Sequence, residues 1–392
     1  MSTATAPRGL GALRSANRER LLLALRENGE VSRAELARLT ALSGTTVSSL
    51  VAELADAGLV TEGGDDRSSG RRGRPGRLVR AVDDRTLVVA LDLSLDVVRA
   101  AVCDASGALL AELDESGAVD PGDDGRGALA HAAGLVERLL ASDGVDRSRV
   151  ERLVVAVAGV VDPLTGVVVA DRTPRWRELD LAQELERATG LATRLENDAD
   201  LCALGERAFG AARGLDDVVH VKVSTGIGVG LVLAGRLYRG AHGGVGELGH
   251  VQVSDLGDLC VCGNRGCLET VAGSAPVLAA LRVVHPHVRT HADLEALVRA
   301  GDRAAIRAVT DAGTAVGRTV ADLCNVLAPQ AVVVGGDLAA GGDHLADAVR
   351  DAVERSTKPR TAGRLVLLTG ELGPRAALLG AVASAAGAPA TA

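Results

Sequence analysis

The spacing of the apolar residues changes near Arg85, so the chain must combine two kinds of fold. Between residues 16 and 60, apolar residues recur at the three- and four-residue intervals of amphipathic helices. From 87–91 and 97–102 onward, short runs rich in Val and Leu are separated by turns and helical stretches, as in a sheet of buried strands connected by helices. We therefore predict a small helical module followed by an α/β body.

The charge of the chain changes at the same boundary. The 392 residues carry a formal charge of −8, but residues 1–80 contain 13 Arg and 9 acidic residues and carry +4, which leaves −12 for the rest. This asymmetry suggests a basic module that contacts nucleic acid, fused to an acidic body. The chain has one Phe, one Tyr and one Trp, which argues against binding single strands or RNA by base stacking. Nearly all of the positive charge is Arg, since Lys222 and Lys358 are the only lysines.

The sequence predicts three helices in the first module. The first ends at Asn28-Gly29, where Gly is expected after a helix. The second begins at Ser32, with Glu35 as the partner in a capping box, and the third begins at Ser43. The residues that we expect to face inward are Leu21, Leu22, Leu25, Leu36, Leu39, Val47, Leu50, Val51 and Leu54.

Three helices with a tight second turn form a helix-turn-helix, and two β segments around the Gly-rich tip that follows would form a wing. The alternatives are a helical bundle with a solvated linker, or a helix-turn-helix that binds protein. Four arginines within residues 71–77 favour DNA, because they can contact phosphates or enter a minor groove. The predicted DNA contacts are Thr45, Thr46, Ser48 and Ser49 in the third helix and Arg71, Arg72 and Arg74 in the wing.

One histidine and three cysteines lie within eighteen positions of the body: His250, Cys260, Cys262 and Cys267. They supply the four ligands of a closed tetrahedral Zn²⁺ site, and glycines between them allow the chain to bend. Because protein fills every position, the zinc is expected to be structural, and a zinc-dependent hydrolase is excluded. The alternative is four buried residues without a metal.

The remaining cysteines are dispersed along the chain, at Cys103, Cys202 and Cys324. In a reducing compartment, six cysteines are expected to be thiols or metal ligands and not disulfides. No apolar run reaches the roughly eighteen residues that a membrane span needs, and the first residues lack the apolar core of a secretory signal. We therefore expect a cytoplasmic protein without a membrane partner.

The metal motif and its surroundings resemble the ROK family (repressors, open reading frames, kinases). The resemblance rests on Gly-Glu-Leu-Gly-His at 246–250 with the Cys-x-Cys-Gly-x-x-Gly-Cys-x-Glu run at 260–269, on Glu-Asn-Asp-Ala at 196–199, on the Ser-Thr-Gly-Ile-Gly turn at 224–228, on Trp176 and on Gly335-Gly336. It covers residues 16 to 385 and implies an actin-like, ribonuclease H-like, two-lobed sugar-kinase fold. An N-terminal helix-turn-helix resembles the family's transcriptional-regulator branch.

This resemblance implies a division into domains and a sugar site. Residues 1–14 would be a flexible arm, 15–82 a winged helix-turn-helix, and 83–392 the sugar-binding body, with a small lobe at about 83–195 plus the C-terminal helix and a large lobe at about 196–372. Asp198 would be the base that takes the proton of the sugar hydroxyl if kinase activity is retained. The implied sugar contacts are Asn197, Asp198, Glu247, His250 and Glu269, with His250 also binding zinc.

The sequence departs from the kinases of the family where the phosphates of ATP would bind. Residues 92–96 read Asp-Leu-Ser-Leu-Asp where family kinases have Asp-x-Gly-Gly-Thr, and side chains with an added negative charge oppose binding of ATP. Ser224 replaces a Gly in the second phosphate turn. The nucleotide contacts implied by the resemblance, which hold only for an active kinase with ATP and Mg²⁺, are Asp92, Thr225, Gly226, Gly228, Gly335 and Gly336.

We therefore expect a sugar-responsive transcriptional regulator, and specifically a repressor, of carbohydrate metabolism. It would bind an inverted-repeat operator as a homodimer or homotetramer and take a sugar or sugar phosphate as effector. The alternative is an ATP-dependent sugar kinase of the glucokinase type, or a protein that combines both activities. Asp198 supports this alternative and residues 92–96 oppose it.

Overall fold

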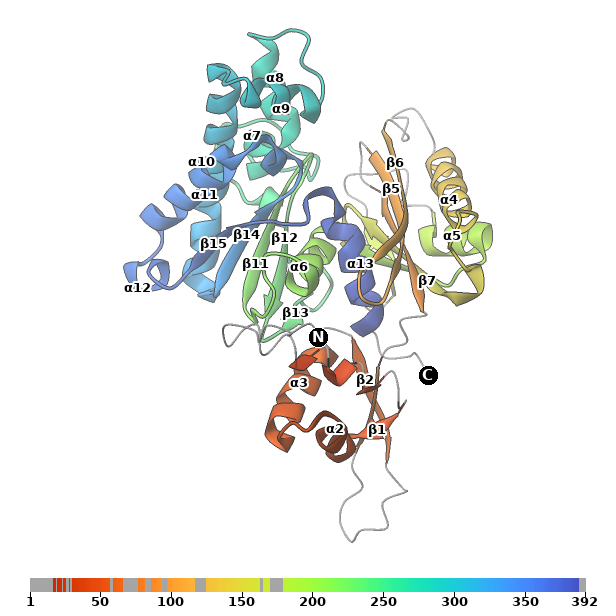
Figure 1. Cartoon of the computed structure of the whole chain (residues 1–392). Helices are drawn as coiled ribbons and strands as arrows, with labels where there is room; N and C mark the ends of the chain where they lie inside the picture. Colours follow the sequence, from red (N-terminus) through yellow and green to blue (C-terminus); the bar gives the residue numbers. More distant parts are fainter. Residues whose placement is uncertain are drawn as a thin grey trace, which may run out of the picture.

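The structure of the chain is a computed structural model, and it describes residues 17–387 except 19, 23, 26–27, 29, 57–58, 66–76, 82–85, 94–96, 117–124, 163–164 and 170–178. The described part forms three bodies along the chain: a small N-terminal module and two α/β lobes (Figure 1). The predicted arm at 1–14, the wing arginines and Trp176 lie outside the described residues.

The N-terminal module is a winged helix-turn-helix, as predicted. Helices α2 (Arg33–Thr40) and α3 (Gly44–Asp56) pack beside a sheet in the order β1-β3-β2, made by β1 (Val31–Ser32), β2 (Val60–Asp65) and β3 (Arg77–Ala81). The side chain of Ser32 accepts a hydrogen bond from the Glu35 N–H, and that of Ser43 accepts one from the Thr46 N–H, so both predicted N-caps are present. The buried core of the module is Leu21, Ala24, Leu25, Leu36, Val47, Leu50, Val51, Leu54, Val60 and Val79.

The prediction that Leu39 faces inward is wrong. Its side chain is 42% exposed, while Thr40 is fully buried. The physical reason is the helical period: Thr40 lies four residues after the buried Leu36 and therefore on the same face. The Thr40 hydroxyl donates a hydrogen bond to the Leu36 carbonyl oxygen, which satisfies this buried polar group within the helix.

The first lobe contains a five-stranded sheet in the order β10-β7-β4-β5-β6. Its strands are β4 (Leu87–Leu93), β5 (Val97–Asp104), β6 (Leu109–Ser116), β7 (Val150–Val157) and β10 (Thr193–Asn197). Strand β4 is buried on both faces because α4 (Arg126–Leu140) and α5 (Leu181–Thr189) pack on one side and α13 (Ala376–Gly387) on the other. Strand β10 continues the sheet past the predicted lobe boundary at residue 195.

The second lobe contains a sheet in the order β13-β12-β11-β14-β15. Its strands are β11 (Val218–Val223), β12 (Ile227–Leu233), β13 (Arg236–Leu237), β14 (Ala331–Gly335) and β15 (Val366–Thr369). The larger of its cores lies under helices α7 (Leu268–Ala272), α8 (Ser274–Arg282), α9 (His291–Arg299), α10 (Arg303–Leu327) and α11 (Asp343–Ser356). A shorter helix of this lobe is α12 (Pro359–Ala362), whereas the short strands β8 (Val160–Val161) and β9 (Val168–Val169) contribute to the core of the first lobe.

Two helices, α6 (Asp198–Phe209) and α13, lie between the two sheets (Figure 1). Their close approach depends on glycine: a Cβ at Gly205 would lie 2.3 Å from the Ala376 carbonyl oxygen, and one at Gly380 would lie 1.8 Å from that of Leu201. The predicted α/β architecture with two lobes is therefore confirmed, and a helix pair marks where the lobes meet. Among the residues that the structure describes, no helix has both the length and the apolar character to cross a membrane.

Candidate sugar, metal and DNA sites

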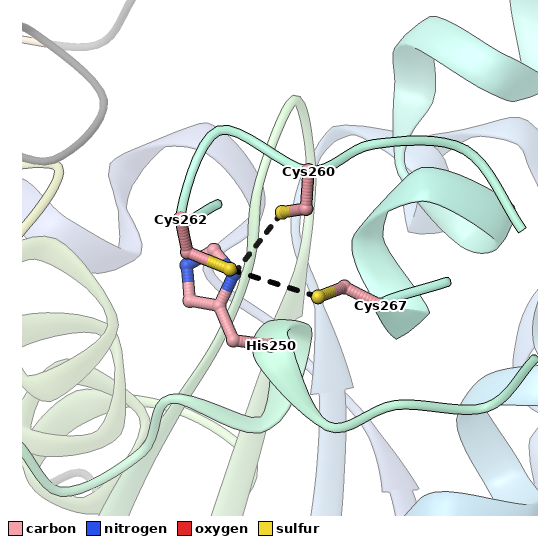
Figure 2. A group of neighbouring side chains, drawn as sticks. All are labelled: His250, Cys260, Cys262 and Cys267. Atoms are coloured by element: carbon pink, nitrogen blue, oxygen red, sulfur yellow. Dashed lines mark hydrogen bonds between the residues drawn. The ribbon is translucent and has the colours of Figure 1, made fainter. Parts of the chain in front are cut away.

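The predicted metal ligands come together in one loop, residues 250–267, which we call the metal loop (Figure 2). Their ligand atoms all lie within 4.8 Å of one another, with Cys260 Sγ 3.4 Å from His250 Nδ1 and Cys262 Sγ 3.7 Å from Cys267 Sγ. Zn–S and Zn–N bonds of ordinary length place tetrahedral ligands about 3.5–3.8 Å apart. This donor set could therefore bind a metal ion such as zinc.

The chain around the metal loop has the turns that this arrangement requires. Gly266 has a φ of +69°, and a Cβ there would lie 1.7 Å from the Ser254 carbonyl oxygen, so no other residue fits without movement. Cys267 directly precedes α7. The backbone N–H of Asn264 is the largest influence that lowers the pKa of Cys262, which favours the thiolate form that binds metals.

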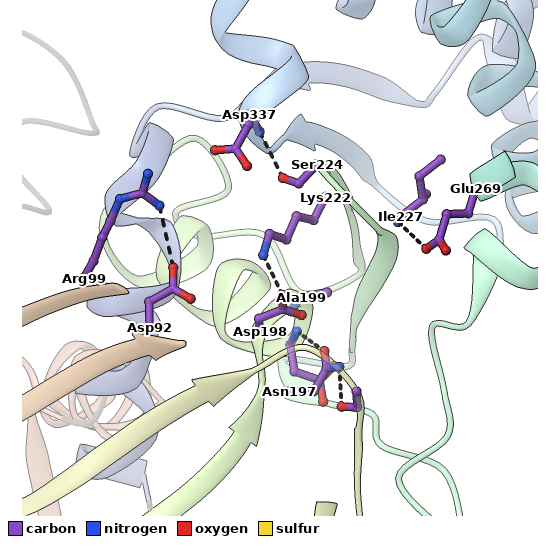
Figure 3. Close-up of polar contacts among 12 residues, drawn as sticks. Asp92, Arg99, Asn197, Asp198, Ala199, Lys222, Ser224, Ile227, Glu269 and Asp337 are labelled. Carbon is purple, nitrogen blue, oxygen red and sulfur yellow. Dashed lines mark hydrogen bonds and ion pairs between the residues drawn. The ribbon is translucent and has the colours of Figure 1, made fainter. Parts of the chain in front are cut away.

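Figure 3 shows three of the predicted sugar contacts: Asn197 and Asp198, where β10 passes into α6, and Glu269 on α7. Asn197 ends β10 and caps α6: its Oδ1 accepts from the Asp200 N–H, and its Nδ2 donates to the Gly159 carbonyl oxygen. Glu269 lies on α7, almost buried, and its Oε2 accepts from the Ile227 N–H at 3.4 Å. Glu269, two residues after the last metal ligand, thus connects α7 to strand β12.

His250 connects the metal cluster to another predicted sugar contact. Its Nδ1 lies 3.4 Å from Cys260 Sγ, and its Nε2 lies 3.5 Å from Glu247 Oε2. This division of the ring nitrogens allows a metal on Nδ1 to fix the tautomer that presents Nε2 to a carboxylate or a sugar oxygen.

Asp198, the predicted base, has partners on both carboxylate oxygens (Figure 3). Oδ1 accepts from the Ala199 N–H at 2.7 Å, and Oδ2 lies 2.5 Å from Nζ of Lys222 on β11. Only 15% of the Asp198 side chain and 14% of that of Lys222 are exposed. Burial lowers the pKa of Lys222, but the charges of Asp198 and then Asp92 raise it well above its ordinary value overall. Lys222 is therefore a buried ammonium in the cleft.

Sequence reasoning missed Lys222 as a site residue. The one available signal was its rarity, since it is one of only two lysines in the chain. Nothing in its neighbourhood along the sequence indicates that Asp198, 24 residues away, is its partner.

Three of the six nucleotide contacts implied by the resemblance line a cavity of about 100 Å³, which we call the inter-lobe cavity. Asp92 at the end of β4 and Gly335-Gly336 after β14 line it, and the turn at 224–226 borders it through Ser224. Gly336 has a φ of +95° and lies against Val223, so its conformation requires glycine. The described residues that line the cavity are Asp92, Arg99, Cys202, Glu206, His220, Lys222, Ser224, Gly335, Gly336, Asp337, Ala339, Thr369, Gly370, Gly373, Pro374, Ala376 and Ala377.

The glycine-rich turn is shorter than the sequence suggested. Only Ser224, Thr225 and Gly226 form it, with the Ser224 N–H bonded to the Gly226 carbonyl oxygen. Gly228 instead lies inside β12, where a Cβ would approach that of Ala199 to 2.9 Å. Its small size allows α6 to pack on the sheet, which corrects its assignment to the turn.

The predicted recognition residues lie at the start of α3. Thr45 and Ser49 are exposed and Thr46 and Ser48 are half-buried, so this end of the helix presents hydroxyl groups to solvent. The Ser43 hydroxyl is within hydrogen-bonding distance of the hydroxyls of Thr45 and Thr46. Strands β2 and β3 form the base of the predicted wing.

Comparison with known proteins agrees with this architecture. A family model described as "ROK family" matches residues 88–387, and one described as "MarR family" matches residues 20–72. The chain therefore belongs to the ROK family, with a MarR-like winged helix at its N-terminus, which confirms the predicted resemblance.

Three similar proteins represent the regulators and kinases of this family. The xylose repressor of Bacillus spizizenii is 27% identical over 368 residues, 94% of each chain. The crystal structure of a ROK family transcriptional regulator, a homologue of Escherichia coli Mlc, gives a TM-score of 0.69 at 25% identity and covers 95% of each chain. A ROK glucokinase from Streptomyces griseus in complex with glucose and AMPPNP gives 0.64 at 28% identity and covers 76% of this chain and 98% of the kinase.

Proposed function

We propose that the protein is a sugar-responsive transcriptional repressor that binds operator DNA through its winged helix. The observation that carries the proposal is the order of the two parts: a winged helix-turn-helix followed by a ROK body, similar over 94% of its length to a xylose repressor. Two such modules in a homodimer or homotetramer would contact the half-sites of an inverted repeat, about one helical turn (~34–36 Å) apart. The effector would change the angle between the lobes and thereby the spacing of the two winged helices.

The sugar would bind where Asn197, Asp198, Glu247, His250 and Glu269 present acceptors and donors in the cleft. A structural Zn²⁺ held by His250 and the three cysteines would order the metal loop and orient His250 toward the sugar. The zinc would carry out no chemistry, because protein ligands fill its tetrahedral shell. Carboxylates and an amide are suited to hydroxyl-rich ligands, since they accept and donate several directional hydrogen bonds.

A sugar kinase is the second candidate function. The resemblance assigns the role of the family's base to Asp198, and the similar structure from Streptomyces griseus contains glucose and AMPPNP. Against this candidate, Asp198 is already paired with Lys222, and accepting a proton from a sugar hydroxyl would disrupt that ion pair.

Two measurements on the purified protein test the proposal. A thermal-shift screen against pentoses, hexoses and N-acetylhexosamines should identify at least one sugar that raises the melting temperature, because a ligand of the native state stabilises it. Mg-ATP added with that sugar should give no sugar phosphate. Turnover at about 1 s⁻¹ or faster, as in ordinary enzymes, would favour the kinase instead.

A further inference from the structure

Ion pairs of the protein itself lie in and beside the inter-lobe cavity. Lys222 from the second sheet pairs with Asp198 at 2.5 Å, and Arg99 from the first sheet lies 3.8 Å from Asp92 (Figure 3). Both cations line the cavity together with Asp337, which follows β14 in the second lobe. Positive and negative groups from both lobes therefore meet in the place where the resemblance puts the phosphates of a nucleotide.

Lys222 is the group on which these charges converge. Its side chain extends from β11 of the second lobe toward Asp198 at the start of α6, and Asp92 of the first lobe is the second charge that acts on it. Lys222 of the second lobe and Asp92 of the first lobe line the same cavity, so their opposite charges attract the lobes to each other. Lys222 thus supplies charge where a nucleotide would bring its phosphates and a metal ion.

A backbone N–H group at the cavity also has a hydrogen-bond partner within the protein. The N–H of Asp337, at the glycine turn after β14, donates to the Ser224 hydroxyl at 3.0 Å. An N–H at such a turn is suited to a phosphate oxygen, so the serine side chain occupies a donor that a nucleotide would use. His220, also lining the cavity, has its pKa lowered to about 3 by burial and then by Lys222, so it adds no positive charge.

We propose that Lys222 is a positioning residue for the sugar response: its ammonium holds Asp198 and attracts Asp92 across the inter-lobe cavity, in place of a bound nucleotide. This inference rests on the proposed function and describes how the same site would be regulated. It predicts that a sugar alone closes the cleft, with no requirement for ATP. The hydroxyl of a sugar that contacts Asp198 shares this carboxylate with Lys222, which makes the ion pair sensitive to the effector.

The experiment measures release of fluorescent operator DNA from the full chain by anisotropy. The titrant is the sugar that gives the largest thermal shift, and each titration is done with and without about 2 mM Mg-AMPPNP as the nucleotide probe, a concentration above ordinary KM values. Three proteins are compared: wild type, Lys222→Met and the charge-conserving control Lys222→Arg. Operator binding without sugar reports that each variant is folded.

For wild type, we expect a sugar midpoint that changes by less than about twofold when Mg-AMPPNP is present. Lys222→Met should need about tenfold more sugar or more, the effect of losing one hydrogen bond between charged groups, while Lys222→Arg should stay within about threefold of wild type. A wild-type midpoint that shifts about tenfold with nucleotide would overturn the inference, as would a Lys222→Met midpoint equal to that of wild type.

The outcomes also separate this inference from the proposed function. A wild-type protein that binds no operator, or that no sugar releases, contradicts the proposed function. A wild type that responds to sugar only with Mg-AMPPNP keeps the proposed function and contradicts the role of Lys222. If Lys222→Met does not bind the operator even without sugar, the inference is tested on wild type and Lys222→Arg instead. Their sugar midpoints with and without Mg-AMPPNP are then compared.

Discussion

Asp200, on the first turn of α6, should make the body less stable as the pH rises. Its side chain is 5% exposed, and among the described residues its Oδ1 has no hydrogen-bond partner. Burial is the main cause that raises its pKa from 3.8 to about 7, opposed by the charge of Arg239 and reinforced by Glu196, Asp198 and Glu247. Asp200→Asn keeps the size of this side chain and removes its titration.

The sign and size of the effect follow from linkage. Between pH 4 and 7 the unfolded chain loses the Asp200 proton while the folded chain keeps it, so folding stability falls across this range and is level above it. A shift of about three units corresponds to at most about 4 kcal/mol. Because local relaxation and water reduce such penalties, we expect Asp200→Asn to be more stable than wild type by about 1–3 kcal/mol at pH 8 and equal to it near pH 4.

The assay is urea unfolding of both proteins at several pH values between 4 and 8.5, with circular dichroism as the signal. Asp322→Asn, which changes an exposed carboxylate on α10, serves as the control and should differ from wild type by less than about 0.5 kcal/mol at every pH. A difference between Asp200→Asn and wild type that does not vary with pH would refute the reasoning.

Three further predictions concern the metal, the join between the lobes and the wing. Cys262→Ser should lose the one zinc ion per chain that we expect in wild type by elemental analysis, and its metal loop should become sensitive to protease; full zinc content would contradict the site. Glu206→Gln should lower the free energy of unfolding by about 2–4 kcal/mol. The Glu206 carboxylate accepts hydrogen bonds from three backbone N–H groups at 2.8–3.2 Å, and an amide nitrogen cannot accept them. A loss below about 0.5 kcal/mol in urea unfolding would contradict this role. Changing Arg71, Arg72 and Arg74 to Ala should weaken operator binding and reduce its salt slope by about 2–3, and an unchanged slope would exclude them from phosphate contact.

Much of this architecture could be predicted from local patterns. The helix caps at Ser32 and Ser43, the buried strand at 87–93 and the metal ligands all follow from residues that are neighbours along the chain or that form a characteristic motif. Such features depend on hydrogen bonds and periodicity within a short segment, which the sequence displays directly.

The features that the sequence did not reveal depend on contacts between distant segments. Lys222 on β11 reaches Asp198 on α6, Ser224 bonds to Asp337, and Glu206 joins α6 to the backbone at 371–372. No periodicity predicts these pairs, because tertiary packing alone brings them together. Gly228 illustrates the same point: in sequence it belongs to a glycine-rich turn, but in the fold it accommodates a packed helix.

The central claim is that a sugar held by Asp198 controls DNA binding by the winged helix. The most direct measurement is the anisotropy of labelled operator DNA during a sugar titration of wild type and of Asp198→Asn. Both proteins should bind the operator equally without sugar. Wild type should release it as sugar is added, and Asp198→Asn should need at least about tenfold more sugar, since the carboxylate that accepts the sugar hydroxyl is lost. Equal sugar midpoints for the two proteins would contradict the account.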